Sequence, residues 1–421
     1  MNYRYEQLQE KKKELENLYP IVDKILKNNK SIGEVRVEKN KLITPKQRAI
    51  EVEDNELSKK IGNAIPKVEL ASLILEVDGW TKFSKCFEHS SGGEPKNKEI
   101  IKNIYASIVS LACNLGHSQM AQASAITRPA LDWTTNWYLR DETLKKAMKN
   151  IINYHHKLPL SSHFGGGTLS SSDGQRFPNS VNSRNATKNP KYFAYGSGIT
   201  HYSWTSDQFS QYGIKVISSS MRDATYILDE ILANITELDI LEHTSDTAGY
   251  TELVFALFSL LGIKFCPRIR DLGSQTLYRF GNRPTEFKNL SPLLNGKIRE
   301  EKILNNWEEL LRVAGSLKMG WSTASLVIQK LQAQTKDSRI AGSLKEYGRI
   351  EKTIHILKYI SEPQYQRKIG KQLNKGEALH SLRKFLFFDN ESKIRIPDSD
   401  DQQIQAQCLN LVTNMVIVVM L

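Results

Sequence analysis

The sequence is poor in cysteine, which limits how the fold can be held together. Four cysteines occur in 421 residues, and no two of them form a C-x-x-C pair: Cys86, Cys113, Cys266 and Cys408. This spacing fits neither a zinc site nor a dense disulfide framework. We therefore expect reduced, mostly buried thiols in a cytoplasmic protein.

Long apolar runs are also scarce, which argues against insertion into a membrane. The N-terminus is polar and charged and lacks the apolar core of a signal peptide. The one long apolar run covers residues 408–421, but it includes Asn410, Thr413 and Asn414. It falls short of the roughly 20 apolar residues that span a bilayer. We predict a buried helix or strand there.

Several sequence motifs of known chemistry are missing. There is no G-x-x-x-x-G-K-[ST] phosphate loop, and Gly165–Gly167 lack the helix-opening context of a dinucleotide fingerprint. The nine histidines form no H-x-x-x-H pair, and the serine-rich S-S-S-D-G stretch has no G-x-S-x-G frame. A zinc enzyme or a serine hydrolase would need groupings that the sequence does not contain.

Basic residues exceed acidic ones, with 58 Lys and Arg against 46 Asp and Glu and a formal net charge of +12. Such an excess favours a polyanionic partner, and nucleic acid and an anionic membrane surface both fit. At about 150 residues per domain, the length predicts two or three domains.

The apolar pattern predicts helices first and a mixed sheet afterwards. Residues 1–30 and 68–156 have helical periodicity, and we interpret Trp80, Trp133 and Trp137 as helix-packing anchors rather than base-stacking residues. After Leu158 the pattern changes to short β-type runs. The predicted strands are Thr168–Ser172, Tyr192–Tyr195, Ile199–Thr205, Ile214–Ser218, Leu238–Thr244 and Lys264–Ile269. Helices are predicted at Arg222–Asn234, Tyr250–Leu261, within Ile303–Ile360 and at Gln364–Phe387. Alternating strands and helices indicate a sheet covered by helices. Tyr192–Tyr195 and Trp204 could contact nucleic-acid bases, but we interpret them as part of the core of this sheet.

Three carboxylates occupy informative places in this pattern. Asp173 and Asp246 each follow a predicted strand, where open α/β sheets place their sites, and Gly174 permits a sharp turn. Glu377 flanks the apolar side of the last predicted helix. Hard cations such as Mg²⁺ bind carboxylate oxygens, and two such ions can drive phosphodiester chemistry. An Asp at a strand end is also typical of a helix N-cap or an Asx-turn. Asp207 and Asp223 compete for the same role.

Several long stretches resemble one protein family. GTLSSSDGQRF, LEHTSDTAGYTELVFALFSLLGIKFCPRIRDL, LKEYGRIEKTIHIL and LNKGEALHSLRKFLFF are similar to the catalytic region of the replicative transposases of the Tn-three group. LEVDGWTKFSKCFEHSSGGEP, NLGHSQMAQAS and LDWTTNWYLRDETLKKAM resemble the helical region that precedes it. The resemblance runs from about Leu75 to Leu411 in the same order.

The resemblance implies an α/β fold with an RNase H-like core, a mixed sheet flanked by helices. A helical insertion and an N-terminal all-helical region would complete it. The implied domains are a helical and linker remnant at 1–66, a helical scaffold at 67–160, the first part of the core at 161–270, the insertion at 271–363 and the last core helices at 364–421. Family members are longer at the N-terminus, and the end at Leu421 suggests a C-terminal truncation.

The resemblance also implies an acidic triad, which falls on Asp173, Asp246 and Glu377. These acids would hold Mg²⁺ or Mn²⁺, as two ions, to cut the 3′ ends of a transposon and join the freed 3′ hydroxyls to target DNA. The implied partners are transposon-end DNA, target DNA and a second copy of the chain. The location would be bacterial and cytoplasmic, on the nucleoid when DNA is bound, with no membrane partner.

Residues near the acids are candidate DNA contacts: Gln175, Arg176, Arg268, Arg270 and Lys375. The basic ones among them could equally be surface ion-pair partners. His243 is interpreted as a structural histidine rather than a metal neighbour. Two other functions remain open: an inactive remnant that binds DNA or full-length transposase, and a free-standing RNase H-like nuclease.

Overall fold

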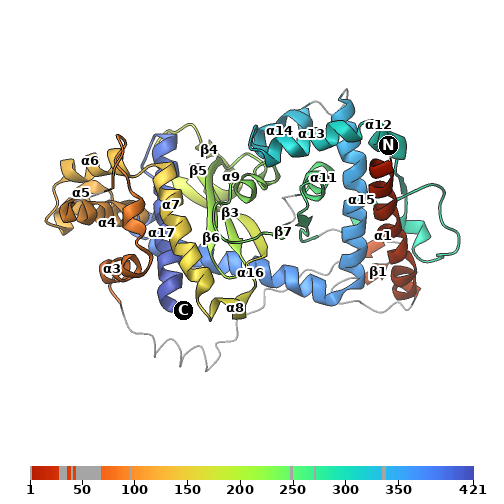
Figure 1. Ribbon diagram of the computed structural model, residues 1–421, viewed down its shortest axis with the longest axis horizontal. Helices are drawn as coiled ribbons and strands as arrows, with labels where there is room; N and C mark the ends of the chain where they lie inside the picture. Colours follow the sequence, from red (N-terminus) through yellow and green to blue (C-terminus); the bar gives the residue numbers. More distant parts are fainter. Residues whose placement is uncertain are drawn as a thin grey trace. The chain divides into compact units, whose positions relative to one another are not determined.

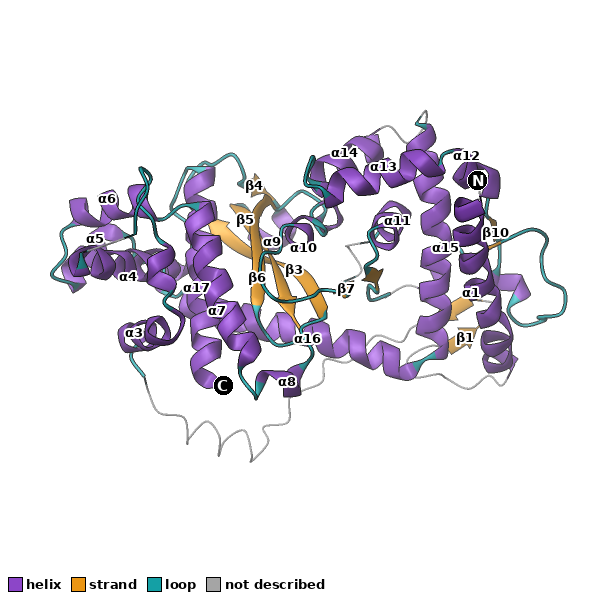
Figure 2. Ribbon diagram, in the orientation of Figure 1, coloured by secondary structure: helices purple, strands orange, loops and turns teal. Residues whose placement is uncertain are grey.

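The computed structural model describes residues 2–27, 36–38, 41–43, 68–94, 97–246, 250–269, 272–333 and 338–421. The chain folds into two compact units, each built from separate stretches of the sequence. The first unit takes residues 1–50, 222–233 and 241–373, and the second takes residues 51–221, 234–240 and 374–421. Figures 1 and 2 show helices and strands in both, so the predicted mixed α/β class is confirmed.

An antiparallel sheet organises the second unit. Its strands are β3 (Leu169–Asn179), β4 (Thr187–Lys188), β5 (Ser197–Ser206) and β6 (Gln211–Ser218). β3 pairs with β5 along its length, while β4 and β6 also pair with β5. Nearly every residue of β5 is buried. Because successive side chains point to opposite faces, both faces of β5 are covered by protein.

Helices make up the rest of the second unit. They are α3 (Leu70–Thr81), α4 (Lys98–Ala112), α5 (His117–Ala123), α6 (Arg128–Tyr138), α7 (Asp141–Lys157), α8 (Ser161–Phe164), α9 (Pro190–Phe193), the end of α16 (Pro363–Leu386) and α17 (Ser399–Met420), with 3₁₀ turns η1 (Phe83–Cys86) and η6 (Asp389–Ser392). α7 and α17 pack side by side, and α17 also packs on α4 and β6 (Figure 2).

The C-terminal apolar run forms α17, which confirms the predicted buried helix. By length and composition α17 could cross a bilayer, but 72% of its most apolar window is buried inside the protein. Such burial is typical of a core helix. The Asn414 amide accepts from the Gln211 N–H at 2.9 Å and donates to the Gln211 carbonyl at 2.9 Å. Asn414 therefore joins the helix to the sheet.

The first unit is arranged around one long helix, α15 (Arg339–Ser361). α1 (Asn2–Lys27) and α11 (Glu252–Leu260) pack along it, and Figure 1 shows α1 beside α15. A Cβ on Gly348 would lie 1.7 Å from the carbonyl oxygen of Glu252, so only glycine permits this close approach.

Short elements complete the first unit. They are β1 (Arg36–Glu38), β2 (Lys41–Ile43), η2 (Asp223–Thr225), α10 (Asp229–Leu232), β7 (Glu242–Ser245), β8 (Lys264–Phe265), η4 (Leu272–Ser274), β9 (Tyr278–Arg279), η5 (Ser291–Leu293), β10 (Gly296–Lys297), α12 (Glu300–Asn305), α13 (Trp307–Lys318), α14 (Ala324–Ala333) and the start of α16. β7 and β8 are parallel and are connected through α11.

Two predicted elements are wrong. Tyr192–Tyr195 is no strand, because Pro190 begins the short helix α9, where a missing N–H is harmless. The predicted helix Arg222–Asn234 is reduced to η2 and α10. Ile227 and Leu228, which lie between η2 and α10, are fully buried. The apolar residues of this segment are therefore spaced for burial, although its backbone is irregular.

The tryptophans and cysteines follow expectation to different degrees. Trp80 stacks on Tyr154 and Trp137 stacks on His89, as packing anchors would. However, Trp80, Trp133 and Trp137 remain 42%, 45% and 43% exposed, so each packs on one side only. All four cysteines are free thiols, and three of them are buried.

The Asn414 contact generates a stability prediction. Asn414→Leu should lower the free energy of unfolding by about 1–3 kcal/mol, because the buried Gln211 N–H would lose its partner. Urea unfolding measures this change. Met420→Leu, at an exposed position of the same helix, should stay within about 0.5 kcal/mol. Equal stability of the Asn414 variant and the wild type would contradict this role.

Candidate active site

Asp173 lies in the middle of β3, not at a strand end as predicted. The ladder continues past it to Asn179, with Asp173 opposite Ser203 and Gly174 opposite Tyr202. Gly174 therefore forms no turn. The odd-numbered residues of β3 share one face of the sheet. Contacts from α16 identify this as the face that α16 covers.

Two contacts align α16 with β3. A Cβ on Gly376 would lie 3.8 Å from Ser171 Oγ, so the helix backbone passes close to Ser171. One turn later, His380 Nδ1 lies 3.7 Å from Asp173 Oδ2. Four helical residues rise about 6 Å and two strand residues about 6.6 Å, so the two contacts match in spacing. Glu377 follows Gly376 directly, which places its backbone beside the Ser171–Asp173 stretch.

Gln175 fixes the same alignment through a hydrogen bond. Its Nε2 donates to the His380 carbonyl at 2.8 Å. The Phe177 and Phe387 rings continue the contact about two turns further on, directly after the last residue of α16, at a centroid distance of 5.1 Å. The end of α16 in the second unit is therefore attached to β3 at four successive levels.

The two acids of the second unit are accessible. The Asp173 side chain is 42% exposed, and its Oδ1 accepts from the Gly174 N–H at 2.8 Å. Glu377 is exposed. Burial, with a smaller contribution from the Arg383 charge, lowers the pKa of His380 to about 3. His380 is therefore neutral at physiological pH and contacts Asp173 as a dipole rather than as a cation.

Asp246 belongs to the first unit and directly follows β7, as predicted for a strand end. Residues 247–249 lie outside the described chain, and α11 begins at Glu252 with Thr251 as its N-cap. The backbone N–H of Arg268 donates to the Ser245 carbonyl at 2.9 Å. Arg268 is thus held next to Asp246.

The predicted DNA contacts have different surroundings. Gln175 and Arg268 lie beside Asp173 and Asp246, as described. Arg176 is exposed, and its guanidinium lies 3.8 Å over the Tyr192 ring. Lys375 Nζ donates to the carbonyls of Asp207 and Phe164, at 2.5 and 2.9 Å. Arg270 lies outside the described residues.

The carboxylates of the three candidate acids suit a hard cation, although the described residues do not form a complete metal site. Among them, no three His, Cys, Asp or Glu side chains are arranged to hold a metal. Asp173, Glu377 and Asp246 offer carboxylate oxygens, and none of the three is buried. Oxygen donors that keep access to water fit Mg²⁺ or Mn²⁺.

His243 has a structural role, as expected. It is fully buried and stacks on Phe258 and Phe265, at centroid distances of 5.7 and 6.4 Å. Burial lowers the pKa of His243 to about 3. An uncharged ring in an aromatic core packs as an apolar group.

No motif in the sequence singles out Arg383, a residue of α16. Arg383 is fully buried, and its Nη2 donates to His201 Nδ1 at 3.1 Å. Its Nε and Nη1 have no hydrogen-bond partner among the described residues. Burial lowers the pKa of Arg383 to about 9. The only available signal is its spacing, three residues after His380 on one helix face.

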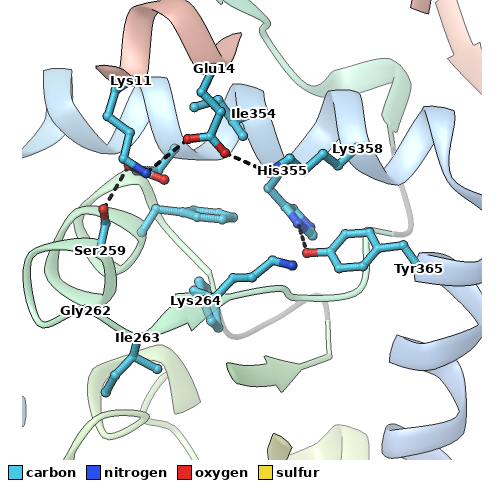
Figure 3. Close-up of a pocket in the computed structure, with 13 residues that line it drawn as sticks. Lys11, Glu14, Ser259, Gly262, Ile263, Lys264, Ile354, His355, Lys358 and Tyr365 are labelled. Atoms are coloured by element: carbon cyan, nitrogen blue, oxygen red, sulfur yellow. Dashed lines mark hydrogen bonds and ion pairs between the residues drawn. The ribbon is translucent and has the colours of Figure 1, made fainter. Parts of the chain in front are cut away.

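The first unit also contains a cavity of about 300 Å³, shown in Figure 3. Charged residues of α1 and α15 close one side of it: Lys358 contacts Glu14 at 2.7 Å and Lys11 contacts Glu351 at 2.9 Å. Burial alone would raise the pKa of Glu14, but the Lys358 hydrogen bond and the Lys11 charge outweigh it and lower the pKa.

On the opposite side of this cavity, the polar groups also contact one another. His355 Nε2 donates to the Pro267 carbonyl at 2.9 Å, and His355 Nδ1 lies 3.1 Å from Tyr365 Oη. Burial, opposed by the Pro267 contact and aided by Lys264 and Lys358, lowers the pKa of His355 to about 3. Lys264 lies 4.6 Å over the Tyr365 ring. The groups that line this cavity therefore bind one another. The ion pairs of Lys11 and Glu14 with residues of α15 hold α1 on the first unit.

Comparison with known proteins agrees with this arrangement. Residues 72–420 match the family model of the Tn3 transposase DDE domain. The transposase for transposon Tn1546 of Enterococcus faecium is 38% identical over 389 residues, which are 92% of this chain and 39% of the relative. The transposase for transposon Tn501 of Pseudomonas aeruginosa is 36% identical over 411 residues, which are 96% of this chain and 41% of the relative.

The chain therefore belongs to the Tn3 transposase family. It spans less than half the length of these relatives.

The Arg383 environment generates a second prediction. Arg383→Met should leave the free energy of unfolding unchanged or raise it by about 1–3 kcal/mol, because an apolar side chain replaces a buried charge with unpaired nitrogens. Urea unfolding measures this change. Lys384→Met, at an exposed position of α16, should alter stability by less than about 0.5 kcal/mol. A loss above about 2 kcal/mol for Arg383→Met would show that the guanidinium stabilises the fold.

Proposed function

We propose that this chain is the catalytic region of a DNA transposase. It would cut transposon 3′ ends and transfer the freed 3′ hydroxyls to target DNA. The observation that supports this proposal is the docking of α16, the helix that carries Glu377, on β3, the strand that carries Asp173. Membership of the Tn3 transposase family supports the same chemistry.

The strand order supports an RNase H-like core. β3, β5 and β6 are successive antiparallel strands, and β7, α11 and β8 follow as a parallel pair with a connecting helix. β3 is then the first strand with Asp173, β7 the fourth with Asp246, and α16 the late helix with Glu377. α12 to α15 fall within the proposed insertion at 271–363, and α3 to α7 fall within the proposed scaffold at 67–160.

Asp173, Asp246 and Glu377 would hold two Mg²⁺ or Mn²⁺ ions. When bound, such ions supply an activated water or hydroxyl and stabilise the leaving oxygen of a phosphodiester. Convergence of Asp246 with the other two acids is part of the proposal.

The surrounding residues would position the acids and the DNA. His380, whose pKa burial lowers to about 3, would meet Asp173 as a neutral ring. Gln175 holds α16 in register, and Arg268 beside Asp246 would pair with a DNA phosphate. Two transposon ends must be joined, so we propose that the chain acts as a dimer.

Metal-dependent cutting of transposon-end DNA tests this function. Asp173→Asn should reduce the cleavage rate about 100-fold or more, because a neutral amide is a poor cation ligand. Glu99→Gln is the matched control, since Glu99 is 68% exposed on α4 and pairs only with Lys102 in the described contacts. It should cut at the wild-type rate.

Three other outcomes would contradict the proposed function. Binding without cutting by the wild type would identify a non-catalytic remnant. Cutting confined to the RNA of RNA–DNA hybrids would identify a free-standing nuclease. Equal cutting by wild type and Asp173→Asn would remove Asp173 from the site.

A further inference from the structure

The segment that follows Asp173 is basic and lacks acids. Residues 174–206 contain no Asp or Glu but contain Arg176, Arg184, Lys188 and Lys191. All four basic residues are exposed. The segment therefore presents an uncompensated positive charge to solvent, which complements a polyanion.

A strained turn lies within this basic segment. The Gly196 N–H donates to the Phe193 carbonyl at 2.8 Å, which closes a β-turn. Ala194 has φ 50° and ψ −114°, values close to the first central position of a type II′ turn. Glycine is the residue that usually occupies this position. An alanine held there costs free energy, and such strain gathers at functional sites.

The strained turn is held on the sheet by the Phe193 side chain. A Cβ on Gly198 would lie 2.1 Å from Phe193 Cζ, so the Phe193 ring packs directly on the β5 backbone. The N–H groups of Tyr192 and Phe193 both donate to the Asn189 carbonyl, at 3.0 and 2.9 Å. Tyr195, two residues after this anchor, is 101% exposed. The turn therefore presents an aromatic side chain fully to solvent from an anchored base.

Tyr192 adds a second aromatic surface. Its ring is 42% exposed, and it lies under the Arg176 guanidinium at 3.8 Å and near Lys191 Nζ at 5.0 Å. Arg176 is three residues from Asp173 on β3, a distance of about 10 Å, and points to the opposite face. DNA on this surface would flank the reacting phosphodiester rather than contain it.

We propose that Arg176, Lys191, Tyr192 and Tyr195, here called the basic turn, bind DNA. Tyr195 stacks on a base that is unpaired or exposed at a duplex end, while the basic side chains contact phosphates. Positive charge without acids favours DNA over an apolar protein partner. This inference deepens the proposed function, since it names the surface that holds DNA next to the candidate acids.

Binding of the full chain to a fluorescein-labelled duplex with a single-stranded 3′ overhang tests this inference, in EDTA and over a series of NaCl concentrations. Tyr195→Ala should weaken binding by about 5- to 100-fold, while Tyr195→Phe should bind like the wild type. The slope of log K against log salt should stay unchanged for Tyr195→Ala, and it should fall by about one for Arg176→Ala.

Two further measurements keep the test specific. Trp321→Ala is the matched control, because Trp321 is 81% exposed but belongs to the first unit; it should bind like the wild type. The fluorescence of 2-aminopurine in the overhang should change on binding of the wild type and not of Tyr195→Ala.

The outcomes separate this inference from the proposed function. If the wild type cuts DNA but Tyr195→Ala binds as tightly as Trp321→Ala, the basic turn is not a DNA-binding surface and the proposed function stands. If Tyr195→Ala binds weakly but the wild type never cuts, the basic turn is supported and catalysis fails. If the wild type neither binds nor cuts, both fail.

Discussion

The docking of α16 along β3 is the contact on which the account depends. The helix backbone at Gly376 lies next to Ser171, and His380 and Gln175 fix the helix one turn further on. The match between helical and strand rise keeps His380 at the level of Asp173, and Glu377 belongs to the same helix. A shift of one residue in this register would rotate His380 by about 100° around the helix, away from Asp173.

The second unit contains both buried and exposed basic side chains. His201 on β5 and Arg383 on α16 are fully buried, and burial lowers the pKa of both. By contrast, Arg176 and Lys191 of the basic turn are exposed, where water and DNA can reach them.

The local pattern of apolar residues in the sequence predicted much of the fold and part of the candidate active site. The position of Asp246 at the end of β7 and the burial of α17 could both be predicted, because the spacing of nearby apolar residues is visible in the sequence. The central position of Asp173 in β3 could not be predicted, because strand length depends on pairing with β5. Tyr192–Tyr195 has β-type composition, but Pro190 and the Phe193–Gly198 contact decide its conformation. The Arg383–His201 contact joins residues far apart in the chain, and no local signal encodes it.

The central claim is that three acids from separate stretches of the chain share metal ions. Replacing Mg²⁺ by Fe²⁺ with ascorbate and peroxide would generate radicals at the bound metal, and these cut the nearby polypeptide backbone. The account predicts fragments ending near Asp173, Asp246 and Glu377 together, and their loss in Asp173→Asn. Cuts near Asp173 and Glu377 without any near Asp246, or cuts that persist in Asp173→Asn, would contradict it.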